Sequence, residues 1–252
     1  MIHKTFTVEG TPDIDIRIES GRVEVHRGEA NQVDINVDTD LPGFIVEQRG
    51  NSVIVSSDEN ESWSSRRSAY VVIATPEGSD LRVSVASAPV TVDVPVGKAE
   101  IKTASGDVDV ERANTLVVKS ASGDLDVGVV VRALRYATAS GDLRVTGSVG
   151  GTVVVSTASG DVVIEKTDAT IELSSASGDA HISYFAGRSA TFKAMSGAID
   201  LGIPEGTTVD LDVSLLSGKL RVPDPDVRTG PAKRQMSIRA KLVSGDLTIS
   251  RV

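Results

Sequence analysis

The four-residue motif Ala-Ser-Gly-Asp recurs five times between residues 104 and 179, and this repetition constrains the fold more than any other feature. The copies begin at Ala104, Ala121, Ala139, Ala158 and Ala176. Degenerate copies follow at 195–198, 216–219 and 243–246. Repeats with a period near twenty residues are typical of solenoids, in which each coil buries its apolar face against the next. The sequence therefore predicts an all-β fold, a parallel β-solenoid or β-helix.

Apolar residues alternate with polar ones on both sides of the motif. Leu116 and Val118 precede one copy, and Leu125 and Val127 follow it. A period of two indicates strands with one face inward. The inward positions change parity across the motif, so the chain must turn a tight corner there, where Gly supplies a positive φ and Ser and Asp hydrogen-bond the turn. Each rung of about 18 residues is then two strands and two corners.

The same pattern extends beyond the copies of the motif. Residues 81–92 fit it with Ala88 in place of the Gly, and we predict about nine consecutive rungs over 81–252. We interpret residues 1–80 as an N-terminal β region that caps the solenoid and includes one rung-like segment, 14–25. Short strands are expected elsewhere in that region, at 32–37, 44–48, 52–56 and 69–75.

The charge balance argues against two classes of partner. The net charge is −9, whereas nucleic acid and anionic membranes are bound through clustered positive charge. Residues 228–252 are a local exception, with six Lys or Arg against one acid. This basic end could bind an acidic partner or could only soften repulsion along an acidic stack.

The absence of cysteine excludes disulfides and thiolate metal sites. The N-terminus lacks the pattern of a signal peptide, and no apolar run approaches the length needed to cross a bilayer. We therefore expect a cytoplasmic protein without membrane insertion, or a cell-surface protein if a leader has been removed.

The repeats resemble a known bacterial family. Segments such as Ser105-Gly-Asp-Val-Asp-Val110, together with the lead-in Tyr70-Val-Val-Ile-Ala, are similar to the "putative adhesin" family of β-solenoid domains, domain of unknown function 4097. The resemblance covers about residues 40–252. It implies the solenoid fold and an adhesin-like role, and it supplies no catalytic residues to carry over.

The aspartates of the repeats are the sharpest candidates for chemistry. Stacked rungs would place them about 5 Å apart, where like charges repel by about 1 kcal/mol even in water. Either each carboxylate accepts backbone N–H bonds at its corner, or the column binds Ca²⁺ through oxygen ligands. Calcium-binding repeats carry acidic residues at both corners, so we expect the structural role, with no metal and no cofactor.

An enzymatic function is the alternative from a different class. A serine nucleophile needs a base within hydrogen-bond reach, and His181, the histidine nearest to a repeated corner, is expected to point outward. Outward pairs such as Asp107 with Asp109, or Asp142 beside Arg144, suit a polysaccharide-active parallel β-helix enzyme, a lyase or glycosidase. Because such enzymes interrupt their repeats with long loops, we favour a non-enzymatic interaction or scaffold protein.

Candidate interaction residues lie where the repeat fails. Trp63 with Arg66 and Arg67 is either a recognition spot or, through Trp63, a cover for the end of the solenoid. The remaining candidates are at the interrupted corner and in the longest insertion: Lys219, Asp224, Asp226, Lys233 and Arg234. The expected partner is a protein or a carbohydrate, and the solenoid could also form a homo-oligomer by end-to-end or lateral contact.

Overall fold

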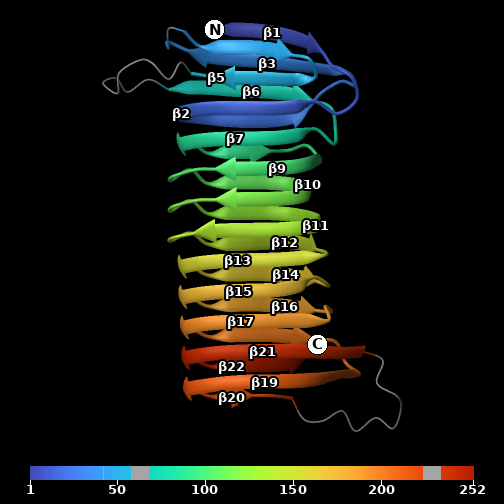
Figure 1. Cartoon of the computed structure of the whole chain (residues 1–252), viewed down its shortest axis with the longest axis vertical. Coiled ribbons are helices and arrows are strands. Elements are labelled where there is room, and N and C mark those ends of the chain that lie inside the picture. Colours follow the sequence, from blue (N-terminus) through green and yellow to red (C-terminus); the bar gives the residue numbers. More distant parts are fainter. Residues whose placement is uncertain (42, 58–67, 224–233) are drawn as a thin grey trace. The chain divides into compact units, whose positions relative to one another are not determined.

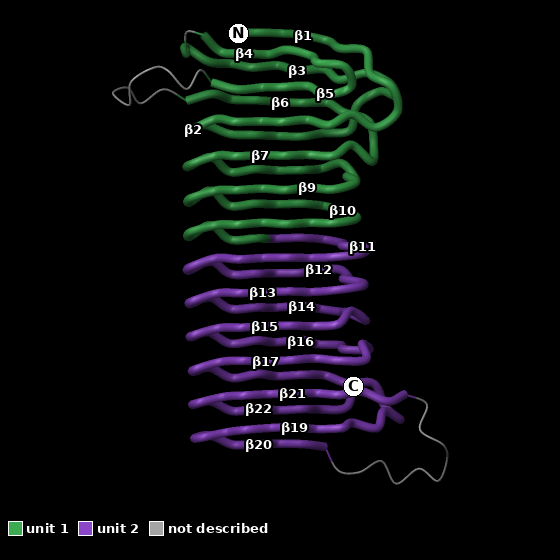
Figure 2. Tube along the Cα trace, in the orientation of Figure 1, with its two compact units in different colours: residues 1–125 green, residues 126–252 purple. Residues whose placement is uncertain are grey.

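The computed structural model describes residues 1–41, 43–57, 68–223 and 234–252. It contains 22 strands, and the described residues include no helix (Figure 1). The all-β class is therefore confirmed. The chain divides into two compact units, residues 1–125 and 126–252, coloured separately in Figure 2.

The described residues of unit 1 form ten strands and the first residue of an eleventh. Their bounds are β1 (Ile2–Thr7), β2 (Asp13–Arg27), β3 (Gln32–Thr39), β4 (Ile45–Arg49), β5 (Ser52–Ser56), β6 (Ala69–Thr75), β7 (Asp80–Ser87), β8 (Val90–Val92), β9 (Val96–Lys102) and β10 (Val108–Lys119). The pairing of β2 changes at Gly21: its first half pairs with β5 and β7, and its second half with β6 and β8, all in parallel. Residues 14–25 thus lie between strands that follow them in the sequence.

Antiparallel pairs form the other part of unit 1. β1 pairs with β3, β3 with β6, and β4 with β5, so the strands within residues 1–80 are of mixed direction. The hairpin between β4 and β5 turns at Gly50, whose φ is 62°. Two polar side chains occupy core-facing rows of the outer strands: Lys4 donates to the Val46 carbonyl at 2.6 Å, and Gln48 donates to the Thr7 carbonyl at 2.7 Å.

Unit 2 is built from parallel pairs. Its strands are β11 (Leu125–Thr138), β12 (Leu143–Val149), β13 (Thr152–Ser159), β14 (Val162–Thr167), β15 (Thr170–Ser177), β16 (Ala180–Phe185), β17 (Ser189–Ser196), β18 (Ile199–Ile203), β19 (Thr207–Ser217), β20 (Leu220–Arg221), β21 (Arg234–Ser244) and β22 (Leu247–Arg251). Partners such as Val153 and Ile171 are 18 positions apart. Both are buried, as are Val162 and Ile164 beyond the next corner, so the inward parity changes at the corner as expected.

The rungs of unit 2 do not stack in the order of the sequence. β21 pairs with β17 on one side and with β19 on the other. Likewise, β22 pairs with β18 and with β20. The prediction of consecutive rungs is therefore wrong at this end, because the last two strands are inserted between earlier ones. The repeat specifies which face of each strand is buried, but it does not specify the neighbouring strand.

Candidate functional site

Close stacking at the tight corners explains why the repeat keeps glycine. A Cβ on Gly178 would collide with the carbonyl oxygen of Gly160, and one on Gly197 with that of Gly178. Gly178 also has a φ of 129°, a conformation that disfavours other residues. Gly106 and Gly123 lie outside the positive-φ region, so the sequence-based reason holds for only some corners. What these corners share is that glycine has no side chain to collide with the backbone of the neighbouring rung.

The aspartates of the corners form a ladder of hydrogen bonds between rungs. The carboxylate of Asp142 accepts from the backbone N–H of Asp161 at 2.8 Å, and Asp161 accepts in the same way from Asp179 at 2.8 Å. The predicted structural role of the column is thus confirmed, with the donor on the next rung. At the outermost rung of unit 2, where no described rung follows to supply an N–H, Lys219 replaces the aspartate.

Removing one carboxylate from this ladder should therefore destabilise the protein modestly. We expect Asp161→Ala to lower the free energy of unfolding by about 1 kcal/mol, because the N–H of Asp179 loses its acceptor. Asp161→Asn should cost less, since the amide oxygen can still accept. Urea denaturation of both variants measures this difference, and an Ala variant as stable as wild type would show that relief of carboxylate repulsion dominates.

The three degenerate corners come together on unit 2 and replace alanine with larger apolar residues. Their first residues are Met195, Leu216 and Val243, where the five regular copies carry Ala. Ser196 and Ser217 both pair with Ser244, so the preceding residues stack in the order Met195, Val243, Leu216. Their exposed fractions are 62%, 48% and 83%. These three side chains, here called the apolar column, form a continuous exposed row.

Two lysines flank the apolar column. Lys193 and Lys241 are direct neighbours on β17 and β21, and both side chains are exposed. Within the described part of the chain, neither forms an ion pair. They line a shallow depression of about 440 Å³ with Met195 and serines of β13 and β15. Adjacent like charges are unfavourable, so an acidic group bound here would relieve their repulsion.

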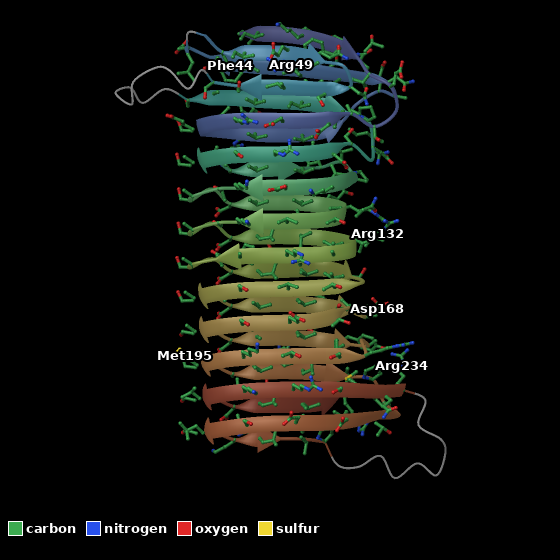
Figure 3. The ribbon with its side chains drawn as sticks, in the orientation of Figure 1. Phe44, Arg49, Arg132, Asp168, Met195 and Arg234 are labelled. Carbon is green, nitrogen blue, oxygen red and sulfur yellow. The ribbon has the colours of Figure 1, made fainter. Side chains whose placement is uncertain are left out.

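The predicted interaction residues are only partly brought together. Lys219 follows the apolar column on the outermost corner and is exposed. Arg234 lies at the opposite end of the strands (Figure 3), beside Thr207 in register. There it lines a depression of about 600 Å³ with Arg188 and Asp210. Trp63, Arg66, Arg67, Asp224, Asp226 and Lys233 fall outside the described residues.

The apolar column itself was missed by sequence reasoning, although a signal existed. The degenerate copies were recognised by their Ser-Gly pair, whereas the informative position is the residue before it. Figure 3 labels Met195 at the edge of unit 2 where the tight corners lie. A large apolar residue at a position that is otherwise Ala, and exposed at a corner, indicates a contact surface.

Outward carboxylates have the partners expected of a solvated strand surface. Arg144 lies 3.9 Å from a carboxylate oxygen of Asp126, and His181 is exposed. In residues 1–41, 43–57, 68–223 and 234–252, no group of three or more His, Asp or Glu side chains has the arrangement of a metal site.

One polar cluster on unit 1 shows a clear electrostatic effect. The phenol of Tyr70 donates to Glu24 at 2.6 Å, and His26 lies 3.4 Å from the same carboxylate. The hydrogen bond from Tyr70, followed by those from His26 and Arg22, lowers the pKa of Glu24 below its ordinary 4.5, and this outweighs the opposing effect of burial. The stabilisation of the fold by these hydrogen bonds is therefore fully present above the ordinary pKa of 4.5, and it is lost as the pH falls through the lowered pKa of Glu24.

Loss of the phenol should shift this titration. We expect Tyr70→Phe to raise the pKa of Glu24 toward 4.5, because its strongest hydrogen-bond donor is removed. NMR titration of the Glu24 carboxyl carbon measures the change. An unchanged midpoint would mean that His26 and Arg22 hold the carboxylate without the phenol.

Comparison with known proteins places the chain in one family and one fold. The family model Toastrack DUF4097 matches residues 11–250. A "putative lipid binding protein" from Parabacteroides distasonis has a similar structure, with a TM-score of 0.53, 14% identity, and coverage of 100% of this chain and 96% of that chain. A "putative adhesin" from Bacteroides fragilis gives a TM-score of 0.42, 12% identity, and coverage of 98% and 96%.

At 14% identity, the structure from Parabacteroides distasonis shows a shared fold alone. Among curated proteins, none matches this chain. Within the described ranges, no helix has the length and apolar character of a membrane span.

Proposed function

The chain belongs to the Toastrack DUF4097 family, as its Ser-Gly-Asp repeats predicted, and we propose that it is a non-enzymatic β-solenoid protein that binds a protein partner. Its rungs of about 18 residues are closed at one end of unit 1 by β1 and β4. The binding surface is the apolar column of unit 2 with the lysines beside it.

One observation carries this proposal. Three corners that are distant in the sequence place Met195, Val243 and Leu216 in one exposed row, where regular corners place Ala. Much of the surface of these side chains lies outside the buried core. Contiguous apolar surface rimmed by polar residues is typical of protein interfaces.

The chemistry of the surface favours a protein over a carbohydrate. The exposed side chains of the column are aliphatic, whereas a sugar ring is usually held by an aromatic face and by several hydrogen-bonding groups. Lys193 and Lys241 supply positive charge at its edge. The complementary partner therefore presents apolar side chains next to acidic ones.

The polar residues at the outer strands of unit 1 support the assignment of the binding surface to unit 2. Lys4 and Gln48 stand in core-facing rows and donate to backbone carbonyls. A charged residue that points inward is a common protection of a sheet edge. The outer strands of unit 1 are therefore closed to a further strand.

The test is capture of partners from the native host with a variant whose three corners are made regular. Met195→Ala, Leu216→Ala and Val243→Ala together remove the column and leave the strands intact. A matched control, Ile45→Ala with Val131→Ala, removes exposed apolar side chains elsewhere.

A partner retained by wild type and by the control, but bound at least about tenfold more weakly by the triple variant, supports the proposal, since a few apolar anchors usually dominate an interface. Equal retention by all three proteins contradicts it.

A further inference from the structure

The outermost strand of unit 2 is an edge that the described chain leaves unpaired. β19 pairs with β21 along one side, and no described strand pairs with its other side (Figure 1). Its core-facing residues Val209, Leu211, Val213 and Leu215 are only half-buried, whereas the matching residues of β21 are buried. An unpaired strand with an open apolar row is a template for pairing with another chain.

The strand carries none of the protection found at the outer strands of unit 1. Residues 207–217 contain no proline, and their core-facing row holds no charge like that of Lys4. Asp210 and Asp212 are the charged residues of β19, and both are exposed on its outward face. Leu220, beyond the corner, is exposed as well.

We propose that β19 pairs with β19 of a second copy of this chain, antiparallel, about a two-fold axis through Val213. The proposal does not depend on the proposed function, because it is argued from the core-facing row of the outermost strand, although Leu216 of the apolar column belongs to the same strand and would face Asp210 of the second copy. The partner surface is then identical on both copies, as a two-fold interface requires.

The sequence of β19 selects this register. Its core-facing row reads Leu211, Val213, Leu215, which is symmetric about Val213. An axis through Val213 sets Leu211 opposite Leu215 of the second copy and joins the two apolar rows. If one strand slid past the other by an odd number of residues, core-facing residues would lie opposite outward ones, which the alternation of a strand forbids. Moving the axis by one whole residue slides the pairing by two residues and keeps the core-facing rows together.

The outward charges favour this register over those centred on Asp212 and on Leu211. With the axis through Val213, Asp212 faces Ser214 of the second copy. An axis through Asp212 would set that carboxylate against itself, and an axis through Leu211 would set Asp210 against Asp212. Like charges directly opposite each other destabilise a strand pair. Head-to-tail growth would need the outer strands of unit 1, where Lys4 and Gln48 oppose pairing, so the assembly stops at two copies.

Sedimentation of the full chain over a range of concentrations tests the proposal. Wild type should sediment with twice the mass of the chain at micromolar concentrations. Val213→Lys installs at β19 the kind of inward charge found at Lys4 and should sediment as a monomer, with circular dichroism showing that it is folded. A wild type that stays monomeric up to millimolar concentration, or a folded Val213→Lys variant that dimerises like wild type, overturns the proposal.

Ser214 provides a second pair of variants on the exposed face. Ser214→Lys should tighten the dimer about fivefold, because the lysine faces Asp212 of the second copy, and Ser214→Asp should weaken it to a similar extent. Within one chain Ser214 lies beside Lys241, so effects on the monomer have the opposite sign. If Ser214→Asp gives a tighter dimer than Ser214→Lys, the dissociation constants follow the contact with Lys241 within one chain, and the proposed register is overturned.

The absence of cysteine gives a direct test of the axis. A single Val213→Cys should crosslink two chains on oxidation, because the cysteine of one chain faces the same cysteine of the second chain. Leu211→Cys should not, since two such residues lie four positions apart along the strands. Equal crosslinking of the two variants overturns the placement of the axis.

Discussion

Removal of residues 224–252 is expected to unfold the end of unit 2, whereas removal of residues 207–233 should leave it folded. The first deletion takes out β21 and β22, which lie between β17 and β18 on one side and β19 and β20 on the other. It therefore leaves β19 and β20 without a partner and exposes Phe192 and Leu201, which are buried in the full chain.

The second deletion removes the outermost rung instead. Thr207 and Arg234 are neighbours in register, so Gly206 can be joined to Arg234 by a shift of one strand spacing, about 4.8 Å. Every remaining strand then keeps its neighbours. Only the half-buried row of β19 is lost, and the buried row of β21 becomes the edge.

Thermal unfolding followed by circular dichroism measures the contrast. We expect the first deletion to lower Tm by roughly 10 °C or more, or to abolish the transition, because several kcal/mol of packing are lost. The second should lower Tm by only a few degrees. A reversed order of effects would mean that the rungs stack in the order of the sequence, and equal effects would also contradict the insertion of β21 between β17 and β19.

Substitution of a corner glycine is expected to have the second large effect. Gly178→Ala should lower the free energy of unfolding by about 3 kcal/mol, because two costs coincide. The φ of 129° is strained for alanine, and the new Cβ collides with the carbonyl oxygen of Gly160 on the neighbouring rung. That oxygen belongs to the stacked backbone and cannot move aside without disturbing the register.

Two control variants separate these costs. Gly50 has a φ of 62° and open space where a Cβ would stand, so Gly50→Ala carries the conformational cost alone. Ser177→Ala changes an exposed side chain of the same corner without touching the backbone. Urea denaturation should rank Gly178→Ala well below both. A Gly178→Ala variant as stable as Gly50→Ala would mean that the carbonyl oxygen of Gly160 leaves room for a Cβ at this corner.

The parts of the fold that depend on local pattern could be predicted from the sequence. Alternation around each motif identified the inward residues, and the change of parity located the tight corners. The role of the aspartates followed from the need to offset repulsion within a stacked column. In each case the physical cause lies within one rung or between two similar ones.

The order of the rungs could not be predicted in this way. Every rung offers similar apolar rows to its neighbours, so the pattern alone does not distinguish a β17–β19 contact from a β17–β21 contact. The surface on unit 2 depends on that order, because Met195 and Val243 are neighbours only when β21 lies beside β17. The large residues at the degenerate corners are visible in the sequence, but their assembly into one row could not be predicted until the strands had been placed.

Crosslinking of paired cysteines on unit 2 tests the rung order most directly. Lys193 and Lys241 are neighbours in register, and Ser214 is the next residue outward from Lys241. Because the natural chain has no cysteine, Lys193→Cys with Lys241→Cys should be bridged on oxidation or by dibromobimane. Lys193→Cys with Ser214→Cys should not, since two strand spacings, about 9.6 Å, exceed the reach of a disulfide. Bridging of the second pair in place of the first would contradict the order β17, β21, β19 and, with it, the surface proposed to bind the partner.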